Sequence, residues 1–67
     1  MYYISIKTYV QGNQVESHDL DNNGKGYSKD EAMRIADEQH DLKGGDGDPL
    51  YGTEATVYDW NGNKVVG

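Results

Sequence analysis

Polar and apolar residues alternate over the first ten positions of the chain, where β-branched and aromatic side chains are frequent. This pattern is typical of a β-strand, and it predicts one from Tyr2 to Val10. The glycine of Gly12-Asn13 suits a two-residue turn, which would place Val10 opposite Val15 and Tyr9 opposite Glu16 in a hairpin. The two faces of the strand would then be Tyr2, Ile4, Ile6 and Val10 on one side, and Tyr3, Ser5, Lys7 and Tyr9 on the other.

A second alternating stretch lies near the end of the chain, from Thr53 to Trp60. It is followed by Asn61-Gly62, the dipeptide that most strongly favours a two-residue hairpin turn. We therefore predict a strand over residues 53–60 and a closing strand after the turn. The expected cross-strand pairs are Asp59 with Lys64, Tyr58 with Val65, and Val57 with Val66.

Between these hairpins the residues favour a helix. Ser28 and Glu31 have the spacing of a capping box, and Gly44 suits a left-handed stop, so we predict a helix over residues 29–43. Its apolar face would consist of Ala32, Ile35, Ala36 and Gln39, flanked by Met33 and Leu42. Residues 44–52 are rich in glycine and aspartate, which predicts a mobile loop.

These elements predict an α+β fold: a single small domain, residues 1–67, of the plan β-β-α-β-β. The sheet would have four mainly antiparallel strands with one helix on one face. The strand order stays open between two arrangements. In one, strands 2–10 and 53–60 are central, and in the other the two hairpins lie side by side.

The predicted sheet has a covered and an uncovered face. The helix would cover Ile4, Ile6, Val10, Ala55, Val57 and Val66. The opposite face would carry Tyr3, Tyr9, Tyr58, Trp60 and Val65. Because tyrosine and tryptophan are enriched in binding hot spots, the four aromatic residues are candidate partner-binding residues. The alternatives are that they cap a thin core or form a dimer interface.

The net charge of −6 lies entirely between Asp37 and Asp59, a segment that contains seven acidic residues and one lysine. The negative electrostatic potential of such a segment attracts cationic surfaces and repels phosphate backbones. We therefore expect a protein partner with a basic surface and no direct nucleic-acid binding. The acidic partner-binding candidates are Asp37, Glu38, Asp41, Asp46 and Asp48. The chain has no cysteine and no apolar run long enough for a membrane span, which favours a cytoplasmic protein without a membrane association.

One segment is similar to the calcium loop of EF-hand and dockerin-like proteins. Residues 19–30 read DLDNNGKGYSKD, with oxygen ligands at the first, third and fifth positions, glycine at the sixth and a carboxylate at the twelfth. The similarity implies Ca²⁺ ligands at Asp19, Asp21, Asn23, Lys25 (through its carbonyl) and Asp30. Gly26 and Tyr27 depart from the pattern, and a strand-to-helix loop uses the same residue types for its turns. No other cofactor is expected.

No catalytic pattern is present, since His18 and His40 are far apart in the sequence and no cysteine is available as a nucleophile. We therefore expect a protein that is not an enzyme.

In size, acidity and hairpin-helix-hairpin plan, the chain resembles small acidic phage proteins that act against host defences, anti-CRISPR proteins among them. This resemblance implies an inhibitor that blocks the basic nucleic-acid-binding surface of a CRISPR effector or another complex in the host cytoplasm. It rests on overall character and transfers no functional residues. The alternatives are a calcium-binding domain using the Asp19 to Asp30 loop, or a homo-oligomeric structural domain such as a homodimer.

Overall fold

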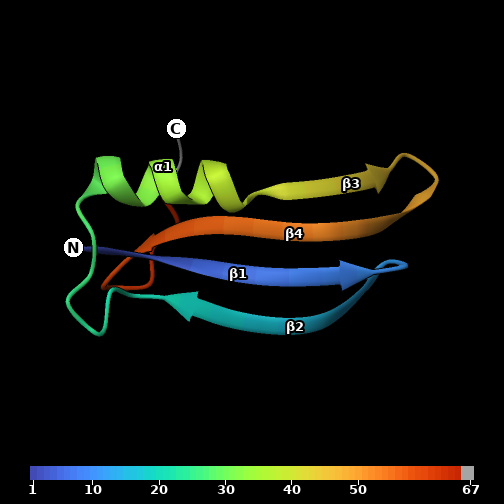
Figure 1. Ribbon diagram of the computed structural model, residues 1–67. Coiled ribbons are helices and arrows are strands. Elements are labelled where there is room, and N and C mark those ends of the chain that lie inside the picture. The colour runs from blue at the N-terminus through green and yellow to red at the C-terminus, as the bar shows by residue number, and fades with distance from the viewer. Residues whose placement is uncertain (66–67) are drawn as a thin grey trace.

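The computed structural model describes residues 1–65 and contains four strands and one helix (Figure 1). The elements in chain order are β1 (Tyr2–Val10), β2 (Asn13–Leu20), α1 (Lys29–Gln39), β3 (Asp41–Gly45) and β4 (Asp48–Asp59). All neighbouring strands are antiparallel, in the order β2-β1-β4-β3. The α+β fold class and the β-β-α-β-β plan are confirmed, but the strand that completes the sheet is Asp41–Gly45. The segment after Asn61-Gly62, predicted as the closing strand, makes only an isolated bridge within residues 1–65, between Tyr58 and Lys64. Of the two strand orders left open, the one with strands 2–10 and 53–60 in the centre is observed.

The core lies between α1 and the two central strands. Ile4, Ile6 and Val57 of the sheet pack against Ala32 and Ala36 of the helix, and Ile4 has no exposed surface. Two alanines on the helix allow its backbone to approach the sheet closely, so this small set of side chains is enclosed. In Figure 1 the helix covers only one half of one face, and the paired strands continue beyond its end. Within residues 1–65 there is no helix that is long and apolar enough to cross a membrane.

The first hairpin forms as predicted but with a different turn and register. The turn is Gln11-Gly12, both with positive φ (50° and 81°), so Val10 pairs with Asn13 and not with Val15. Val15 is an extra, unpaired residue of β2, because Gln14 pairs with Tyr9 and Glu16 pairs with Thr8. The predicted pairs of Val10 with Val15 and Tyr9 with Glu16 are therefore wrong. The position of the turn accounts for the difference, because a turn one residue earlier shifts the pairs beside it by two residues. The bulge at Val15 then shifts the rest of the ladder back by one residue.

The helix starts as predicted and ends earlier. Ser28 is the N-cap, and its Oγ accepts a hydrogen bond from the Glu31 amide at 3.3 Å. The helix ends at Gln39, and Asp41–Gly45 then forms β3, which pairs with the first half of β4. The prediction of helix to residue 43 is wrong for a tertiary reason: those residues hydrogen-bond to the open edge of β4. The last helical turn also has no basic residue to complement the helix dipole.

The segment expected to be a mobile loop, residues 44–52, is a second tight hairpin. Asp46 and Gly47 have φ of 50° and 102°, and Gly45 pairs with Asp48 across this two-residue turn. One residue of β3, Gly44, faces two residues of β4, Pro49 and Leu50, so the proline lies at a bulge. Asp-Gly is a hairpin signal in its own right, and it was the sequence feature that could have revealed this turn.

The final turn follows Asp59 but does not use the predicted two-residue geometry. The Asp59 amide donates to the Asn63 carbonyl, and the Gly62 amide donates to the Asp59 carbonyl, both at 3.0 Å. The loop therefore has three residues, ends on a glycine with φ of 85°, and places Tyr58 opposite Lys64. The predicted pairs of Asp59 with Lys64 and Tyr58 with Val65 are shifted by one residue. The pair of Val57 with Val66 lies outside the described residues, as does the place of Val66 in the core.

Replacing Ile4 tests whether the stability depends on this small core. We expect Ile4→Val to lower the free energy of unfolding by about 0.5–1.5 kcal/mol, because it leaves a methyl-sized cavity among fully buried groups. Val15→Ala, at a bulged position that is 60% exposed, should change it by less than about 0.5 kcal/mol. Urea denaturation followed by circular dichroism measures both. Equal losses in the two variants would contradict the proposed core.

Gly52 tests the pairing of β3 with β4. It has φ of 116°, and a Cβ there would overlap the carbonyl oxygen of Asp41. We expect Gly52→Ala to cost about 1–3 kcal/mol, through backbone strain together with this overlap. Gly45→Ala is the matched control, since Gly45 also has positive φ (95°) but no atom within 4 Å of the added carbon. A Gly52 variant no less stable than the Gly45 variant, in thermal unfolding, would show that β3 does not lie as described.

Candidate functional site

Three aromatic side chains form a stack on the sheet face that the helix leaves uncovered. The ring centroids of Tyr3 and Tyr58 are 5.6 Å apart with an interplanar angle of 20°, and those of Tyr3 and Trp60 are 5.7 Å apart at 25°. Tyr3 lies directly opposite Tyr58 in the β1–β4 ladder. We call Tyr3, Tyr58 and Trp60 the aromatic cluster. Tyr3 and Tyr58 are largely buried, whereas Trp60 is 50% exposed.

The position of Trp60 is set by the turn that contains it and by a glycine from another loop. Asp59 Oδ1 accepts hydrogen bonds from the amides of Asn61 and Asn63, both at 2.9 Å, which holds the turn closed. Gly26 is buried against the indole, and a Cβ there would lie 2.8 Å from Trp60 Cζ2. Sequence reasoning did not identify Gly26 as part of this face. Only the fold brings residue 26 beside residue 60.

The four aromatic residues lie on the uncovered face as predicted, but only three of them cluster. Val65, predicted on the same face, packs against the core on the helix side, so that prediction is wrong. Tyr9 points to the uncovered face by strand alternation, but it pairs with Gly52, at the opposite end of β1 from Tyr3. Between the two ends the face is polar, with Ser5 opposite Thr56 and Lys7 opposite Glu54. The aromatic cluster is therefore a compact patch at one end of a polar face, and Tyr9 lies outside it.

The carboxylate of Asp59 has a lowered pKa. The main cause is the hydrogen bond from the backbone amide of Asn63, and the amide of Asn61 and the side chain of Asn63 act in the same direction, while partial desolvation opposes them. The ionised form is thus the one that the turn stabilises, because its oxygens accept these hydrogen bonds. The charge on Asp59 is part of what holds Trp60 against Tyr3.

The acidic candidates follow one long side of the molecule. Asp37 and Glu38 lie on α1, Asp41 begins β3, Asp46 is in the turn after it and Asp48 begins β4. Figure 1 shows α1 and β3 in line along one side of the sheet. We call these five residues the acidic edge. They form a row rather than a cluster, and they do not surround the aromatic cluster.

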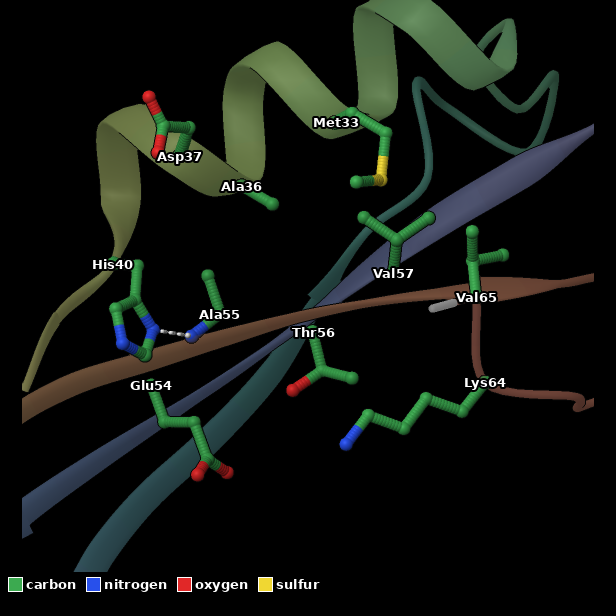
Figure 2. Close-up of a pocket in the computed structure, with 10 residues that line it drawn as sticks. All are labelled: Met33, Ala36, Asp37, His40, Glu54, Ala55, Thr56, Val57, Lys64 and Val65. Atoms are coloured by element: carbon green, nitrogen blue, oxygen red, sulfur yellow. Dashed lines mark hydrogen bonds between the residues drawn. The ribbon is translucent and has the colours of Figure 1, made fainter. Parts of the chain in front are cut away.

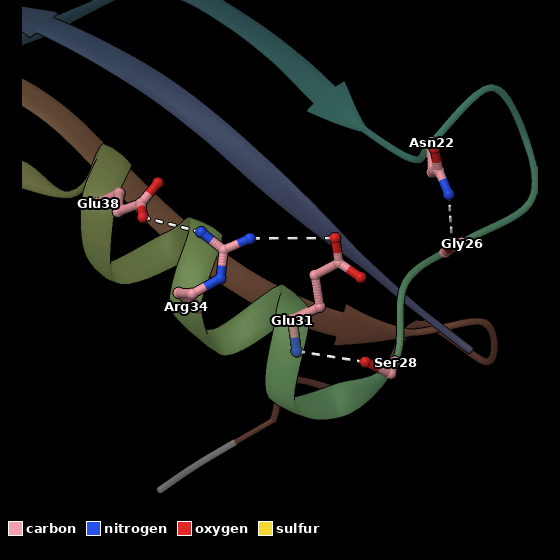
Figure 3. A network of polar contacts seen from close by, with 6 residues as sticks. All are labelled: Asn22, Gly26, Ser28, Glu31, Arg34 and Glu38. Carbon is pink, nitrogen blue, oxygen red and sulfur yellow. Dashed lines mark hydrogen bonds and ion pairs between the residues drawn. The ribbon is translucent and has the colours of Figure 1, made fainter.

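Two members of the acidic edge are partly neutralised. The Arg34 guanidinium lies 2.9 Å from Glu38 Oε1 and 4.0 Å from Glu31 Oε1 (Figure 3). Lys43 Nζ lies 3.9 Å from Asp41 Oδ1. No ion pair within residues 1–65 involves Asp37, Asp46 or Asp48. These three exposed aspartates therefore carry most of the field along this edge.

The segment similar to a calcium loop is divided between three elements. Asp19 lies in β2 and pairs with Ser5. The following loop contains Asp21, Asn23 and Lys25, and Asp30 is in the first turn of α1. That loop is closed by its own hydrogen bonds, including one from Asn22 Nδ2 to the Gly26 carbonyl at 3.2 Å (Figure 3). Residues 1–65 contain no group of three or more His, Asp or Glu side chains placed to hold a metal. Calcium binding stays a prediction from the sequence.

A shallow hollow of about 350 Å³ lies beside β4, where β3 no longer covers its edge (Figure 2). There the His40 ring takes the place of a neighbouring strand, and its Nδ1 accepts a hydrogen bond from the Ala55 amide at 3.2 Å. Asp37, Glu54 and Lys64 contribute charges of both signs to the lining. His40 thus has a structural role in the sheet edge. His18, the other histidine, lies on β2 beside Glu16, at 3.1 Å.

Comparison of this chain with protein-family models, with curated proteins and with solved structures finds no match.

Asp59→Asn tests the role of the carboxylate in the turn. Because the folded pKa is lowered, the ionised group stabilises the fold at pH values above its ordinary pKa of 3.8, and this contribution is lost as the pH falls through the folded pKa. We expect the variant to melt at a lower temperature than the wild type at neutral pH, and the difference to shrink on acidification below 3.8. A difference independent of pH, in thermal unfolding followed across this range, would contradict the assignment.

Proposed function

We propose that this chain is a small, non-enzymatic protein-binding module that contacts its partner through the aromatic cluster and attracts a basic partner surface through the acidic edge. The observation that carries the proposal is the exposed stack of Trp60 on Tyr3 at the uncovered end of the sheet. Large aromatic side chains held rigidly by neighbours lose little entropy on binding, so they are effective anchors in protein interfaces.

The polar surround of the cluster supports the same proposal. Ser5, Lys7, Glu54 and Thr56 give the rest of the face hydrogen-bonding groups and charges of both signs. A small apolar centre with a polar rim is the usual anatomy of an interface between proteins that also exist separately. Within residues 1–65 the helix packs on the other face, which leaves this one accessible to a partner.

The acidic edge supports a basic partner, although its residues are separated from the aromatic cluster. Charges attract over roughly 10 Å at moderate salt, so they increase the rate of encounter without touching the partner. Asp37, Asp46 and Asp48 would act in this way. The aromatic cluster would set the lifetime of the complex, and the acidic edge would set how quickly it forms.

A basic surface that binds nucleic acid is the partner surface that an acidic module of this kind would occupy. The resemblance to phage anti-defence proteins points to a CRISPR effector or another nucleic-acid-handling complex of the host cytoplasm. Inhibition would then be steric and electrostatic, since the bound module would occupy the place of the phosphate backbone.

The proposal is tested with a partner captured from host lysate, purified, and measured against variants by surface plasmon resonance. We expect Trp60→Ala to speed dissociation and weaken Kd roughly thirtyfold, about 2 kcal/mol, as for a central aromatic anchor. Tyr51→Ala is the matched control: Tyr51 is a more exposed aromatic residue of β4, but it pairs with Lys43 on the helix side of the sheet. It should leave Kd unchanged.

The acidic edge is tested by the double variant Asp37→Asn and Asp48→Asn, which leaves the ion pairs of Arg34 intact. Association should be about tenfold slower at low salt, and the difference should disappear at high salt. Equal binding by the wild type and Trp60→Ala would refute the proposed surface. A wild type that captures only itself and sediments as a dimer, dissociated by Trp60→Ala, would instead identify the cluster as a homodimer interface.

A further inference from the structure

The chain contains two Asn-Gly dipeptides, Asn23-Gly24 and Asn61-Gly62, and the structure holds them in different ways. Asn-Gly is the dipeptide in which the side-chain amide is most open to attack by the next backbone nitrogen, because glycine has no side chain to hinder the approach. The residues of both dipeptides are exposed, and a Cβ at either glycine would meet no atom within 4 Å. They differ in their hydrogen bonds.

Asn23-Gly24 forms the centre of a turn with positive φ at both residues, 57° and 85°. The turn is closed by the Lys25 amide, which donates to the Asn22 carbonyl at 3.1 Å. In residues 1–65 no acceptor is hydrogen-bonded to the Gly24 amide, and the Asn23 side chain has no hydrogen-bond partner. The nucleophile and the group that it would attack are therefore both free.

Asn61-Gly62 is restrained by Asp59. The Gly62 amide donates to the Asp59 carbonyl at 3.0 Å, and the Asn61 amide donates to Asp59 Oδ1 at 2.9 Å. The attacking nitrogen must lose its proton, and a hydrogen bond holds that proton in place. Attack by Gly62 thus requires the turn to open first.

We infer that Asn23 is a site of spontaneous deamidation in the folded protein, and that Asn61 is protected by its turn. The backbone nitrogen of Gly24 bonds to Cγ of Asn23, the bond from Cγ to Nδ2 breaks, and the Gly24 proton leaves with the amide as ammonia. Water then opens the cyclic imide at either carbonyl, giving aspartate or the β-linked isoaspartate. Either product adds a negative charge beside Asp21.

The experiment incubates the whole folded protein in mildly alkaline buffer and follows both sites by tryptic peptide mass spectrometry. Cleavage after lysine places Asn23 and Asn61 in separate peptides, residues 8–25 and 44–64. We expect Asn23 to react roughly fivefold or more faster than Asn61, the factor that one hydrogen bond of ordinary strength provides. In denaturant the two sites should react at similar rates, since both are then unrestrained Asn-Gly.

Two variants keep the inference testable. Asp59→Ala removes the carboxylate that accepts from the Asn61 and Asn63 amides and holds the turn closed, so it should accelerate reaction at Asn61 and leave the rate at Asn23 unchanged. Gly24→Ala should slow reaction at Asn23, because the added methyl group hinders the attack. Equal rates at the two sites in the folded protein, or a faster reaction at Asn61, would overturn the inference.

Discussion

The pairing of β1 with β4 is the interaction on which the other features of this structure depend. It joins residues that are 43 to 57 positions apart in the chain, with Ile4 opposite Val57 and Tyr3 opposite Tyr58. Because successive side chains alternate between the faces, this single register places the aliphatic pair under the helix and the aromatic pair on the open face. A slip of one residue would expose the core and bury the tyrosines. Both the stability and the candidate site thus depend on the same ladder.

The core that this ladder supports is small, and the shape of the molecule follows from that. Two helical alanines and three sheet residues make up the buried cluster, and the helix covers only one half of the sheet, on the left in Figure 1. The other half of the sheet, beyond the end of the helix, is stabilised by backbone hydrogen bonds and tight turns. One of these bonds runs from the Gly12 amide to the Leu50 carbonyl at 2.8 Å. Because residues 1–65 contain one helix, the second face stays open and presents Trp60 and its neighbours to solvent.

The charges and the aromatic side chains are separated in this fold. The acidic edge runs along α1 and β3, whereas the aromatic cluster lies at the end of the opposite sheet face. Contact and long-range attraction act over different distances, so the two features do not need to share one patch. Asp59 is an acidic residue that lies beside the aromatic cluster. Its carboxylate belongs to the turn that positions Trp60 and not to the acidic edge.

The sequence by itself determined the features that depend on neighbouring residues. Alternation in residues 2–10 and 53–60 defined the two central strands and their faces, and Ser28 with Glu31 marked the start of the helix. The aromatic residues Tyr3, Tyr58 and Trp60 could therefore be assigned to one face in advance. The packing around Trp60 could not be predicted, because Gly26 comes to its indole from a distant loop.

Tertiary structure decided the features in which local preferences were balanced or overruled. Residues 41–43 suit a helix, but they form a strand because the edge of β4 offers backbone hydrogen bonds that a longer helix would leave unused. The bulge at Val15 and the three-residue turn at Asn61 each shift a register by one position, which sequence spacing does not reveal. The acidic residues formed a row along one edge for the same reason: their places follow from where the helix ended and β3 began.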